Sequence, residues 1–433
     1  MEERHKLILV KQNPQWTGEA IEVPGFERDM LDIVRKYLGE KQIIAVVGLR
    51  RVGKTVLLKQ LINEIKGAQK NICYISFDDR DFQKYETGYE LIDYFLQNSQ
   101  KTSKRYLFLD EIQKVPNWPD LLKTLYDSEK NLKMVISGSS SLEMKKYKET
   151  LAGRILTFHV PIMTFREFTR YHGLEWKVNK GNLQRDYDMK FLSKRVLYEQ
   201  LFQKYILRGA FPELLDKENE EYIRKYISEM VDKVIADVSR AIDPLKEKEI
   251  NDLILLFCKS TGRVFEINNI SSILKVNRNT ASKYIDLLEK AFIIRIVYNY
   301  TKSVAKRLRV GKKGYLIHSS IPISELQYPF SISSLDSMDM GHLIETAILG
   351  NLEDVSFWSH QNYEVDVILK DGTPVEIKYK SQVSREDWKS LIAFMEKYKV
   401  AEGILVTKDL FGQKQIDGRK ILFIPAWLFL LTV

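Results

Sequence analysis

Residues 43–61 read IIAVVGLRRVGKTVLLKQL, which predicts a buried strand, a glycine-rich turn and a helix in direct succession. Residues 48–55 fit the pattern G-x-x-x-x-G-K-[ST], whose glycines let backbone N–H groups surround phosphate oxygens. In this pattern Lys54 would reach the β- and γ-phosphates of a nucleotide, and Thr55 would ligate Mg²⁺. We therefore expect ATP and Mg²⁺ as cofactors; the alternative is a chance match. The predicted nucleotide-binding residues are Gly48, Arg50, Arg51, Val52, Gly53, Lys54, Thr55 and Val56.

A second apolar strand, RYLFLDEIQ (105–113), ends in two adjacent carboxylates. Asp110 is expected to hold the Mg²⁺ shell, and Glu111 to orient or deprotonate an attacking water. A base next to the metal ligand implies hydrolysis of the nucleotide rather than binding alone.

Two further polar elements follow this acidic pair. The strand MVISGSSS (134–141) has a polar end, where Ser137, with Ser139 close behind, could contact the γ-phosphate or the water. Arg154 in LAGRILTF (151–158) is a candidate arginine finger. It would act within the chain, or from a neighbouring copy in a homo-oligomer, and the alternative is a salt-bridged surface arginine.

Residues 20–160 alternate short apolar strands with amphipathic helices. Continuous apolar strands separated by helices indicate a parallel sheet covered on both faces. The predicted fold class is therefore α/β, and the expected strands are residues 43–47, 71–77, 105–110 and 132–137.

The order of these motifs resembles a known family. GLRRVGKT, FLDEIQKVPNW, ISGSSS, LAGRILTFHVPIMTFREF and RGAFPEL follow one another as in archaeal and bacterial AAA+-related ATPases. More narrowly, they resemble those whose C-terminal half is the domain of unknown function 4143. The resemblance implies a P-loop core with a helical lid, and it makes Arg208 a candidate second nucleotide-sensing arginine. The group usually has proline where this chain has Leu49, which leaves the phosphate loop intact.

Residues 265–300 predict a helix-turn-helix, in which Asn277 can cap a second helix that begins near Arg278. Two strands after it flank a basic loop, and a helix-turn-helix with a basic wing is a DNA-docking arrangement. The alternatives are a module that packs proteins together, or a solvated hairpin tip. The predicted DNA contacts are Arg278, Asn279, Lys283, Lys306, Arg307 and Arg309, and the predicted wing also includes Lys302, Lys312 and Lys313.

Residues 362–380, NYEVDVILKDGTPVEIKYK, predict two strands around an Asp-Gly turn. Alternation along the strands places Asp366, Glu376 and Lys378 on one face. This D-x₉-E-x-K spacing resembles the PD-(D/E)XK nuclease superfamily, whose sites also take a glutamate from a preceding helix, here Glu345. Carboxylates bind Mg²⁺, so Glu345, Asp366 and Glu376 are predicted metal ligands, and Asp366, Glu376 and Lys378 predicted catalytic residues. The alternative is an amphipathic hairpin with a solvated polar face.

The expected regions are a P-loop ATPase core, a helical lid, a winged helix, a Ser/Pro-rich linker and a nuclease-like α/β domain. Their predicted bounds are residues 1–160, 161–245, 246–318, 319–337 and 338–433.

Composition fits this organisation. The net charge of +9 and the pI near 9.1 favour a polyanionic partner such as nucleic acid. Cys73 and Cys258 lie in apolar runs, so no disulfide or metal framework is expected and the setting is predicted to be cytoplasmic. The N-terminus lacks the pattern of a signal peptide, and the apolar run 421–433 is too short to span a bilayer. We expect this run to be a buried strand and a terminal turn.

Two functions remain open from the sequence. The first is an ATP-hydrolysing protein that binds and processes DNA with a Mg²⁺-dependent nuclease-like domain. The second is an ATP-driven switch that uses the C-terminal half only for recognition. A chaperone-like ATPase that acts on protein is a third and weaker alternative, which predicts no salt-dependent DNA binding.

Overall fold

A computed structural model describes residues 1–67, 69–138, 149–175, 177–301 and 311–433. The chain divides into two units, residues 1–161 and 162–433, which are treated separately below. In the described part of the chain, no helix is both long enough and apolar enough to cross a bilayer.

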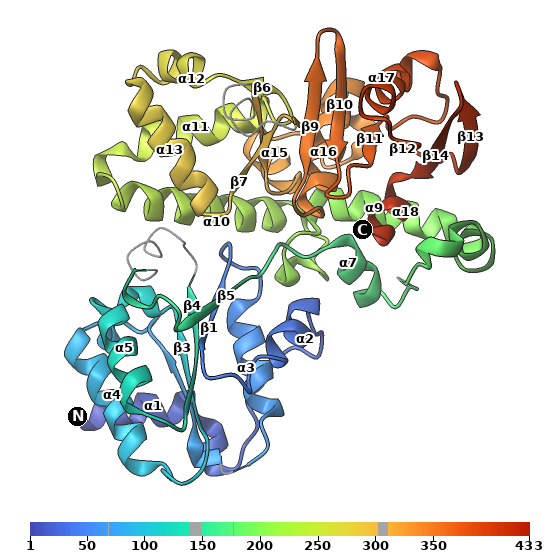
Figure 1. The fold of residues 1–433 in the computed structure, drawn as a ribbon. Coiled ribbons are helices and arrows are strands. Elements are labelled where there is room, and N and C mark those ends of the chain that lie inside the picture. Colours follow the sequence, from blue (N-terminus) through green and yellow to red (C-terminus); the bar gives the residue numbers. More distant parts are fainter. Residues whose placement is uncertain (68, 139–148, 176, 302–310) are drawn as a thin grey trace. The chain divides into compact units, whose positions relative to one another are not determined.

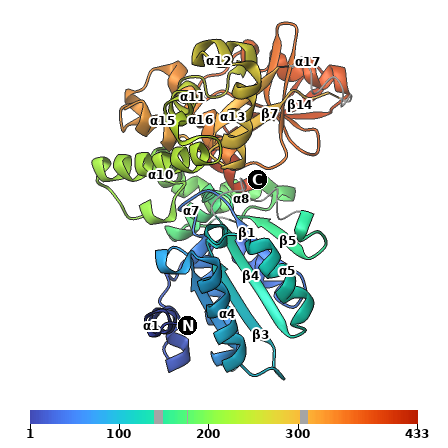
Figure 2. The same ribbon diagram turned by 90° about the vertical axis from the view of Figure 1, so that its left-hand side faces the viewer.

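The first unit contains strands β1 (Ile43–Val47), β2 (Ile72–Ser76), β3 (Arg105–Asp110), β4 (Leu132–Gly138) and β5 (Ile155–His159). Its helices are α1 (Glu3–Gln12), α2 (Asp29–Arg35), α3 (Lys54–Glu64), α4 (Tyr85–Asn98) and α5 (Trp118–Ser128). The strands form a parallel sheet in the order β2-β3-β4-β1-β5. Helix α3 lies on one side of this sheet and α4 and α5 on the other, as Figures 1 and 2 show.

This sheet confirms the predicted P-loop fold class. Strands β1 and β4 are buried along their whole length, because helices cover both faces of the sheet. Strands β1, β3 and β4 run in the same direction, so their carboxyl ends lie at one edge. That edge is where open α/β sheets bind ligands.

The outer edge of strand β2 is closed by side chains from the N-terminal segment. Asn13 acts as a substitute strand residue: its side-chain amide donates to Tyr74 O at 2.7 Å and its Oδ1 accepts from Tyr74 N at 2.7 Å. Gln12 and Gln15 make further bonds to the backbone of Ser76 and Ile72. The edge therefore presents few free backbone groups for pairing with another chain.

The second unit begins with helices α7 (Phe165–Tyr171), α8 (Leu183–Asp186), α9 (Arg195–Arg208) and α10 (Glu220–Arg240). The C-terminal residues pack on this layer, because helix α18 (Ala426–Thr432) contacts α7 and α9. Trp427 stacks on Tyr198, with ring centroids 4.8 Å apart. The predicted terminal turn is thus wrong: the apolar run continues from a strand into a buried helix, since apolar residues lie on every side of it.

A small module follows, with helices α11 (Glu247–Lys259), α12 (Ile267–Leu274) and α13 (Arg278–Lys290). Its strands β6 (Val264–Phe265), β7 (Ile294–Tyr298) and β8 (Lys312–Leu316) form an antiparallel sheet in the order β6-β8-β7. The predicted cap of α13 is confirmed, because Asn277 Oδ1 accepts from Thr280 N at 2.8 Å.

The predicted linker at residues 319–337 is instead largely packed structure. Residues Ser320–Glu325 form helix α15, which lies against α10 and α11. Ser319 is fully buried and donates to Ile206 O at 2.6 Å, and Ser320 lies 2.9 Å from His318 Nδ1. Ser319 and Ser320, two of the serines that suggested a solvated segment, thus have hydrogen-bond partners inside the protein.

The last region forms a mixed sheet in the order β13-β14-β12-β11-β10-β9. Helix α16 precedes it, and α17 connects β11 to its parallel neighbour β12. Their bounds are α16 Ser337–Gly350, β9 Ser356–His360, β10 Tyr363–Ile368, β11 Pro374–Ile377, α17 Lys389–Tyr398, β12 Glu402–Thr407, β13 Gly412–Ile416 and β14 Arg419–Pro425.

Candidate functional sites

The phosphate loop lies between β1 and α3 in the first unit. Gly53 caps α3 with φ 97°, a left-handed conformation that disfavours a side chain. A Cβ on Gly48 would lie 2.5 Å from Val160 O, so the loop also needs glycine there for close packing. Between the glycines, Arg50 and Arg51 are half-buried and Val52 is buried, while Val56 lies in the first turn of α3.

Lys54 is folded back onto this loop. Its ammonium donates to Gly48 O at 3.0 Å and Leu49 O at 2.9 Å, and its side chain is buried. Burial lowers the pKa of Lys54, while the carboxylates of Glu111 and Asp110 oppose the shift. The loop therefore holds a desolvated cation whose bonded partners are neutral carbonyls, which favours an incoming anion.

Arg28 braces the same loop, and sequence reasoning missed it. Its guanidinium donates to Val52 O at 2.7 Å and to Pro161 O at 3.1 Å. It precedes α2, far from the phosphate motif in the sequence, and carries no pattern of its own. We regard it as a positioning residue, because its guanidinium donates to the loop backbone at Val52 O.

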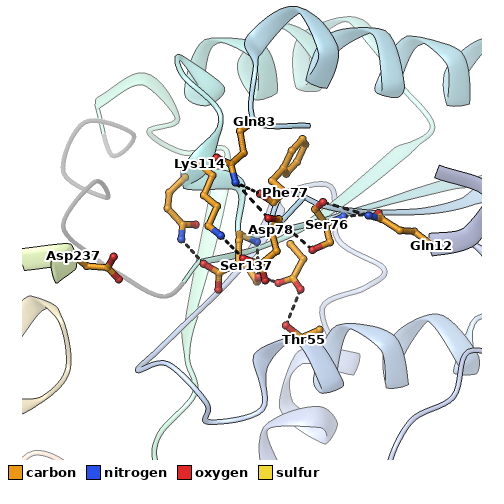
Figure 3. Close-up of polar contacts among 12 residues, drawn as sticks. Gln12, Thr55, Ser76, Phe77, Asp78, Gln83, Lys114, Ser137 and Asp237 are labelled. Atoms are coloured by element: carbon orange, nitrogen blue, oxygen red, sulfur yellow. Dashed lines mark hydrogen bonds and ion pairs between the residues drawn. The ribbon is translucent and has the colours of Figure 1, made fainter. Parts of the chain in front are cut away.

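Asp110, at the end of β3, collects hydroxyl groups from three other elements. Its Oδ2 accepts from Thr55 at 2.7 Å and from Tyr74 at 2.8 Å, and its Oδ1 accepts from Ser137. Thr55 and Ser137, which donate to Asp110 from α3 and β4, are labelled in Figure 3. The structure thus brings the predicted metal residues Thr55 and Asp110 together, beside the predicted Ser137. Tyr74 was not predicted, because it reads as one more apolar residue of a buried strand.

Glu111 follows Asp110 in a left-handed conformation, with φ 54°. Its backbone N–H donates to Ser137 Oγ at 3.1 Å, and its Oε2 accepts from Gln113 at 2.5 Å. Glu111 thus lies directly after the carboxyl end of β3. Ser139, the neighbour of Ser137 in the prediction, lies outside the described residues.

A cavity of about 670 Å³ adjoins Asp110 on the β2 side. Thr55 and Asp110 form one wall, and Lys59, Tyr74 and Ser76 continue it. Asp78 also lines this cavity and forms an ion pair with Lys114, as Figure 3 shows.

The structure does not place Arg154 beside the phosphate loop. It directly precedes β5, and its carbonyl accepts from Ile43 N at the amino end of β1. The phosphate loop follows the carboxyl end of β1. Because β1 has five residues, its two ends are about 16 Å apart. Arg154 instead pairs with Asp127, with Nε–Oδ1 3.0 Å. The finger role within the chain is therefore not supported, because the sheet separates the two ends.

Arg208 belongs to the second unit, where its buried side chain donates to Glu218 Oε1 at 2.7 Å. It ends helix α9, directly before Gly209. Its Nε has no hydrogen-bond partner among the described residues.

The predicted carboxylate and lysine groups of the C-terminal sheet form a cluster. Lys378 Nζ lies 2.5 Å from Glu376 Oε1 and 3.9 Å from Asp366 Oδ2. Glu345 reaches the same cluster from α16, and its Oε1 accepts from Tyr315 at 2.5 Å. The three carboxylates are at most 9% exposed, which contradicts the alternative of a solvated hairpin face.

Burial dominates the electrostatics of this cluster. Burial raises the pKa of Glu345 to about 7; Lys313 opposes that shift and Asp366 adds to it. Burial and the charge of Asp366 also raise the pKa of Glu376 well above its ordinary value, against Lys378. Asp366 and Glu376 raise the pKa of Lys378 despite its own burial. The cluster therefore carries less negative charge at neutral pH than its carboxylates could.

The predicted metal set is not preformed in this cluster. Within the described ranges, no three His, Cys, Asp or Glu side chains are grouped closely enough to hold a metal ion. Lysine ammonium groups lie among the carboxylates instead. Glu376 Oε2 is nevertheless buried without a hydrogen-bond partner in this part of the chain, so one acceptor remains available.

The predicted basic wing needs a correction. Lys312 and Lys313 belong to strand β8, and Lys313 is only 2% exposed because it points into the acid cluster. Arg278, Asn279 and Lys283 are exposed on the first turns of α13. The other predicted DNA contacts, Lys306, Arg307 and Arg309, and the wing residue Lys302 lie outside the described residues.

Comparisons with known proteins agree with this division. Residues 40–169 match the model of an AAA domain, residues 199–326 a domain of unknown function (DUF8612), and residues 334–428 a domain of unknown function (DUF4143). The first match contains the phosphate loop, Asp110 and Glu111. The chain therefore has an AAA-type, P-loop ATPase-like domain. Residues 334–428 form a DUF4143 region, whose function is unknown.

The similar curated proteins are uncharacterised. One from Methanocaldococcus jannaschii is 26% identical and covers 94% of this chain and 89% of its own length. One from Haemophilus influenzae is 23% identical and covers 89% of this chain and 94% of its own.

Among solved structures, the replication initiator DnaA bound to AMPPCP and single-stranded DNA is 16% identical, with a TM-score of 0.27. This alignment covers 64% of this chain and 92% of that one. Cdc6p from Pyrobaculum aerophilum is 12% identical, with a TM-score of 0.29, over 72% of this chain and 95% of that one. Scores this low carry no argument about function.

Proposed function

We propose that this chain is an ATP hydrolase that acts on DNA. The observation that carries the ATPase part is the position of Asp110, bonded to Thr55 and Ser137 beside the phosphate loop. These groups come from three elements that meet at the carboxyl edge of the sheet. Such a meeting of a hydroxyl, a carboxylate and a desolvated lysine suits a nucleotide and its metal ion.

The residues of the first unit fit both cofactors. Backbone N–H groups of residues 48–55 and the Lys54 ammonium would hold the phosphates, and Thr55 and Asp110 would hold Mg²⁺. When bound, ATP supplies the phosphoryl group, and Mg²⁺ neutralises its charge. Glu111 would take a proton from the attacking water, while the hydroxyl of Ser137 orients the groups around it.

This assignment is tested by paired substitutions in the full chain. Lys54→Ala should abolish tight ATP binding, whereas Glu111→Gln should bind ATP but lose about 10²–10⁴ in hydrolysis rate. Asp120→Asn, an exposed acid on α5, is the matched control and should leave both unchanged. Normal hydrolysis by Glu111→Gln would remove Glu111 as the base.

The DNA part of the proposal is supported by the small module of α11–α13 and β6–β8. A helix capped by Asn277 presents Arg278 and Lys283 to solvent at its start, as a recognition helix would. Each phosphate contact releases counterions, so Arg278→Ala with Lys283→Ala should reduce the salt slope of binding by about 2. Lys248→Ala with Lys259→Ala on α11 removes the same charge and serves as the control. A slope equal to that of wild type would place DNA contact elsewhere.

A second candidate function, metal-dependent hydrolysis of DNA, is favoured by the C-terminal cluster. Helix α16, strands β10 and β11, and the residue after β11 bring together three buried carboxylates, Glu345, Asp366 and Glu376, and the partly exposed Lys378. Asp366 and Glu376 would hold Mg²⁺, and the unpartnered Glu376 Oε2 fits an incoming cation. The competing reading is the ATP-driven switch that uses this cluster for recognition only.

Cleavage assays separate these two readings. Duplex, single-stranded and branched DNA are incubated with Mg²⁺ or Mn²⁺ and the full chain. Cleavage that is abolished by Asp366→Asn supports the nuclease, and DNA binding without cleavage supports the switch. The ATP hydrolysis rate with and without each DNA tests whether the two activities are coupled.

A further inference from the structure

The acid cluster has a second lysine from outside the predicted nuclease-like region. Lys313 lies on strand β8 of the small three-stranded sheet and is 2% exposed. Its Nζ is 2.6 Å from Glu364 Oε1 and 3.7 Å from Glu345 Oε1. It also lies 5.4 Å from the centroid of the Phe357 ring. The nuclease motif itself accounts for Lys378 but not for this residue.

Strand β8 contributes more than one group. Tyr315, two residues further along the same face of β8, donates to Glu345 Oε1 at 2.5 Å. Space for Glu345 depends on Gly262, where a Cβ would lie 3.3 Å from Glu345 Oε2. Glu345 is therefore contacted on one side by Tyr315 of β8 and by Gly262. The hairpin of β10 and β11 forms the other side of the cluster.

We propose that Lys313 is a positioning residue of this site, an internal cation that holds Glu345 and competes with a divalent metal ion for its carboxylate. The inference rests on the second candidate function. A buried carboxylate requires a cation nearby, and Lys313 already meets this need for Glu345. The buried, unpartnered Glu376 Oε2 independently indicates that the cluster can accept a further cation. Metal must then displace the Lys313 ammonium from Glu345 to use all the carboxylates.

The charge of Lys313 is tested by metal affinity in the full chain. Mn²⁺ binding is measured by calorimetry without DNA for wild type, Lys313→Met, Lys313→Gln and Lys313→Arg, in a background of Lys54→Ala to silence the nucleotide site. Both uncharged variants should bind Mn²⁺ at least about tenfold more tightly, because a competing cation has gone. The Lys313→Arg variant keeps the charge and should bind like its parent. Gln retains a hydrogen-bond donor, so it reports on charge if the Met variant does not fold.

Two results would overturn the proposal. One is equal Mn²⁺ affinity in the folded Lys313→Gln variant and its parent. The other is a similar gain in affinity for Tyr315→Phe, which removes a hydrogen bond to Glu345 without removing charge. A failure of the proposed nuclease is separate, because it shows as absent DNA cleavage by wild type whatever the metal affinities are.

Discussion

The phenol of Tyr74 donates a hydrogen bond to Asp110 Oδ2 at 2.8 Å, the same oxygen that accepts from Thr55. Tyr74 lies on β2, beside β3, and the register pairs it with Phe108. Burial raises the pKa of this phenol, and the negative charge of Asp110 adds to the shift, so it stays a donor. A donor that cannot ionise fixes the orientation of the carboxylate predicted to hold Mg²⁺.

Tyr74→Phe should therefore weaken the use of Mg²⁺ more than the binding of ATP. Outer partners of metal ligands typically change metal affinity by about 10–100-fold when they are lost. The Mg²⁺ concentration for half-maximal ATP hydrolysis should rise by about tenfold. Tyr106→Phe, on β3 near its amino end, is the matched control. An unchanged Mg²⁺ requirement would show that Thr55 and Ser137 suffice to orient Asp110.

Arg154 offers a test of assembly. Because it lies at the sheet edge opposite the phosphate loop, Arg154→Ala should leave ATP hydrolysis by dilute protein within about twofold of wild type. Asp127→Asn breaks the same ion pair and serves as the control. If hydrolysis rises with protein concentration, and Arg154→Ala alone removes that rise, Arg154 acts in a neighbouring copy. A large loss in dilute protein would contradict the position described here.

Asn13 should be important for the stability of the first unit. Its side chain is fully buried, and its amide bonds to Leu9 O and to both backbone groups of Tyr74. Asn13→Leu keeps the size but leaves these groups unpaired, which should cost about 2–4 kcal/mol of unfolding free energy. Asn98→Ala, an exposed helix residue, should cost less than about 0.5 kcal/mol. Equal denaturation midpoints for both variants would contradict the claim that the hydrogen bonds of Asn13 at the edge of β2 stabilise the first unit.

His318 should make the second unit sensitive to acid. Burial lowers its pKa to about 3, so the ring is neutral when folded, and its Nδ1 accepts from Ser320 N at 3.1 Å. The unfolded state binds a proton below its ordinary pKa near 6.5, so stability falls as the pH drops below that value. Between pH 7.5 and 5.0 this one group should cost about 2 kcal/mol.

The measurement compares wild type with His318→Phe, which keeps a ring against Tyr205. Urea unfolding at pH 7.5 and pH 5.0 gives the loss of stability for each protein. Wild type should lose about 2 kcal/mol more than the variant over this interval. Identical losses would mean that another group controls the acid response.

The sequence was most informative where one motif fixes both backbone and chemistry. The phosphate loop and the strand that ends in Asp110 could be predicted, because glycine spacing and an apolar run each dictate a local structure. The serines at 319 and 320 suggested a solvated linker, since composition does not show that their partners are Ile206 and His318. The sequence left Arg154 open between an arginine finger and a salt-bridged surface residue, because it does not show at which end of the sheet Arg154 lies.

Lys313 shows the limit of local patterns most clearly. It follows a run of basic residues, and a run of like charges is ordinarily a solvated surface. Its actual partners, Glu345 and Glu364, lie 32 and 51 positions further along the chain. Long-range pairing of this kind leaves no periodic pattern in the sequence, because it depends on how strand β8 packs against α16 and β10 in the folded protein.

The ion pair of Lys313 with Glu364 has a consequence for inheritance. Lys313 lies in the stretch that matches one family model, residues 199–326, and Glu364 in the stretch that matches another, residues 334–428. A recombination that replaced residues 334–428 alone would leave the buried Lys313 ammonium without its carboxylate partners, and an uncompensated buried charge costs about 3–5 kcal/mol. Natural selection should therefore transmit the two stretches as one heritable block, with substitutions on either side of the junction occurring in matched pairs.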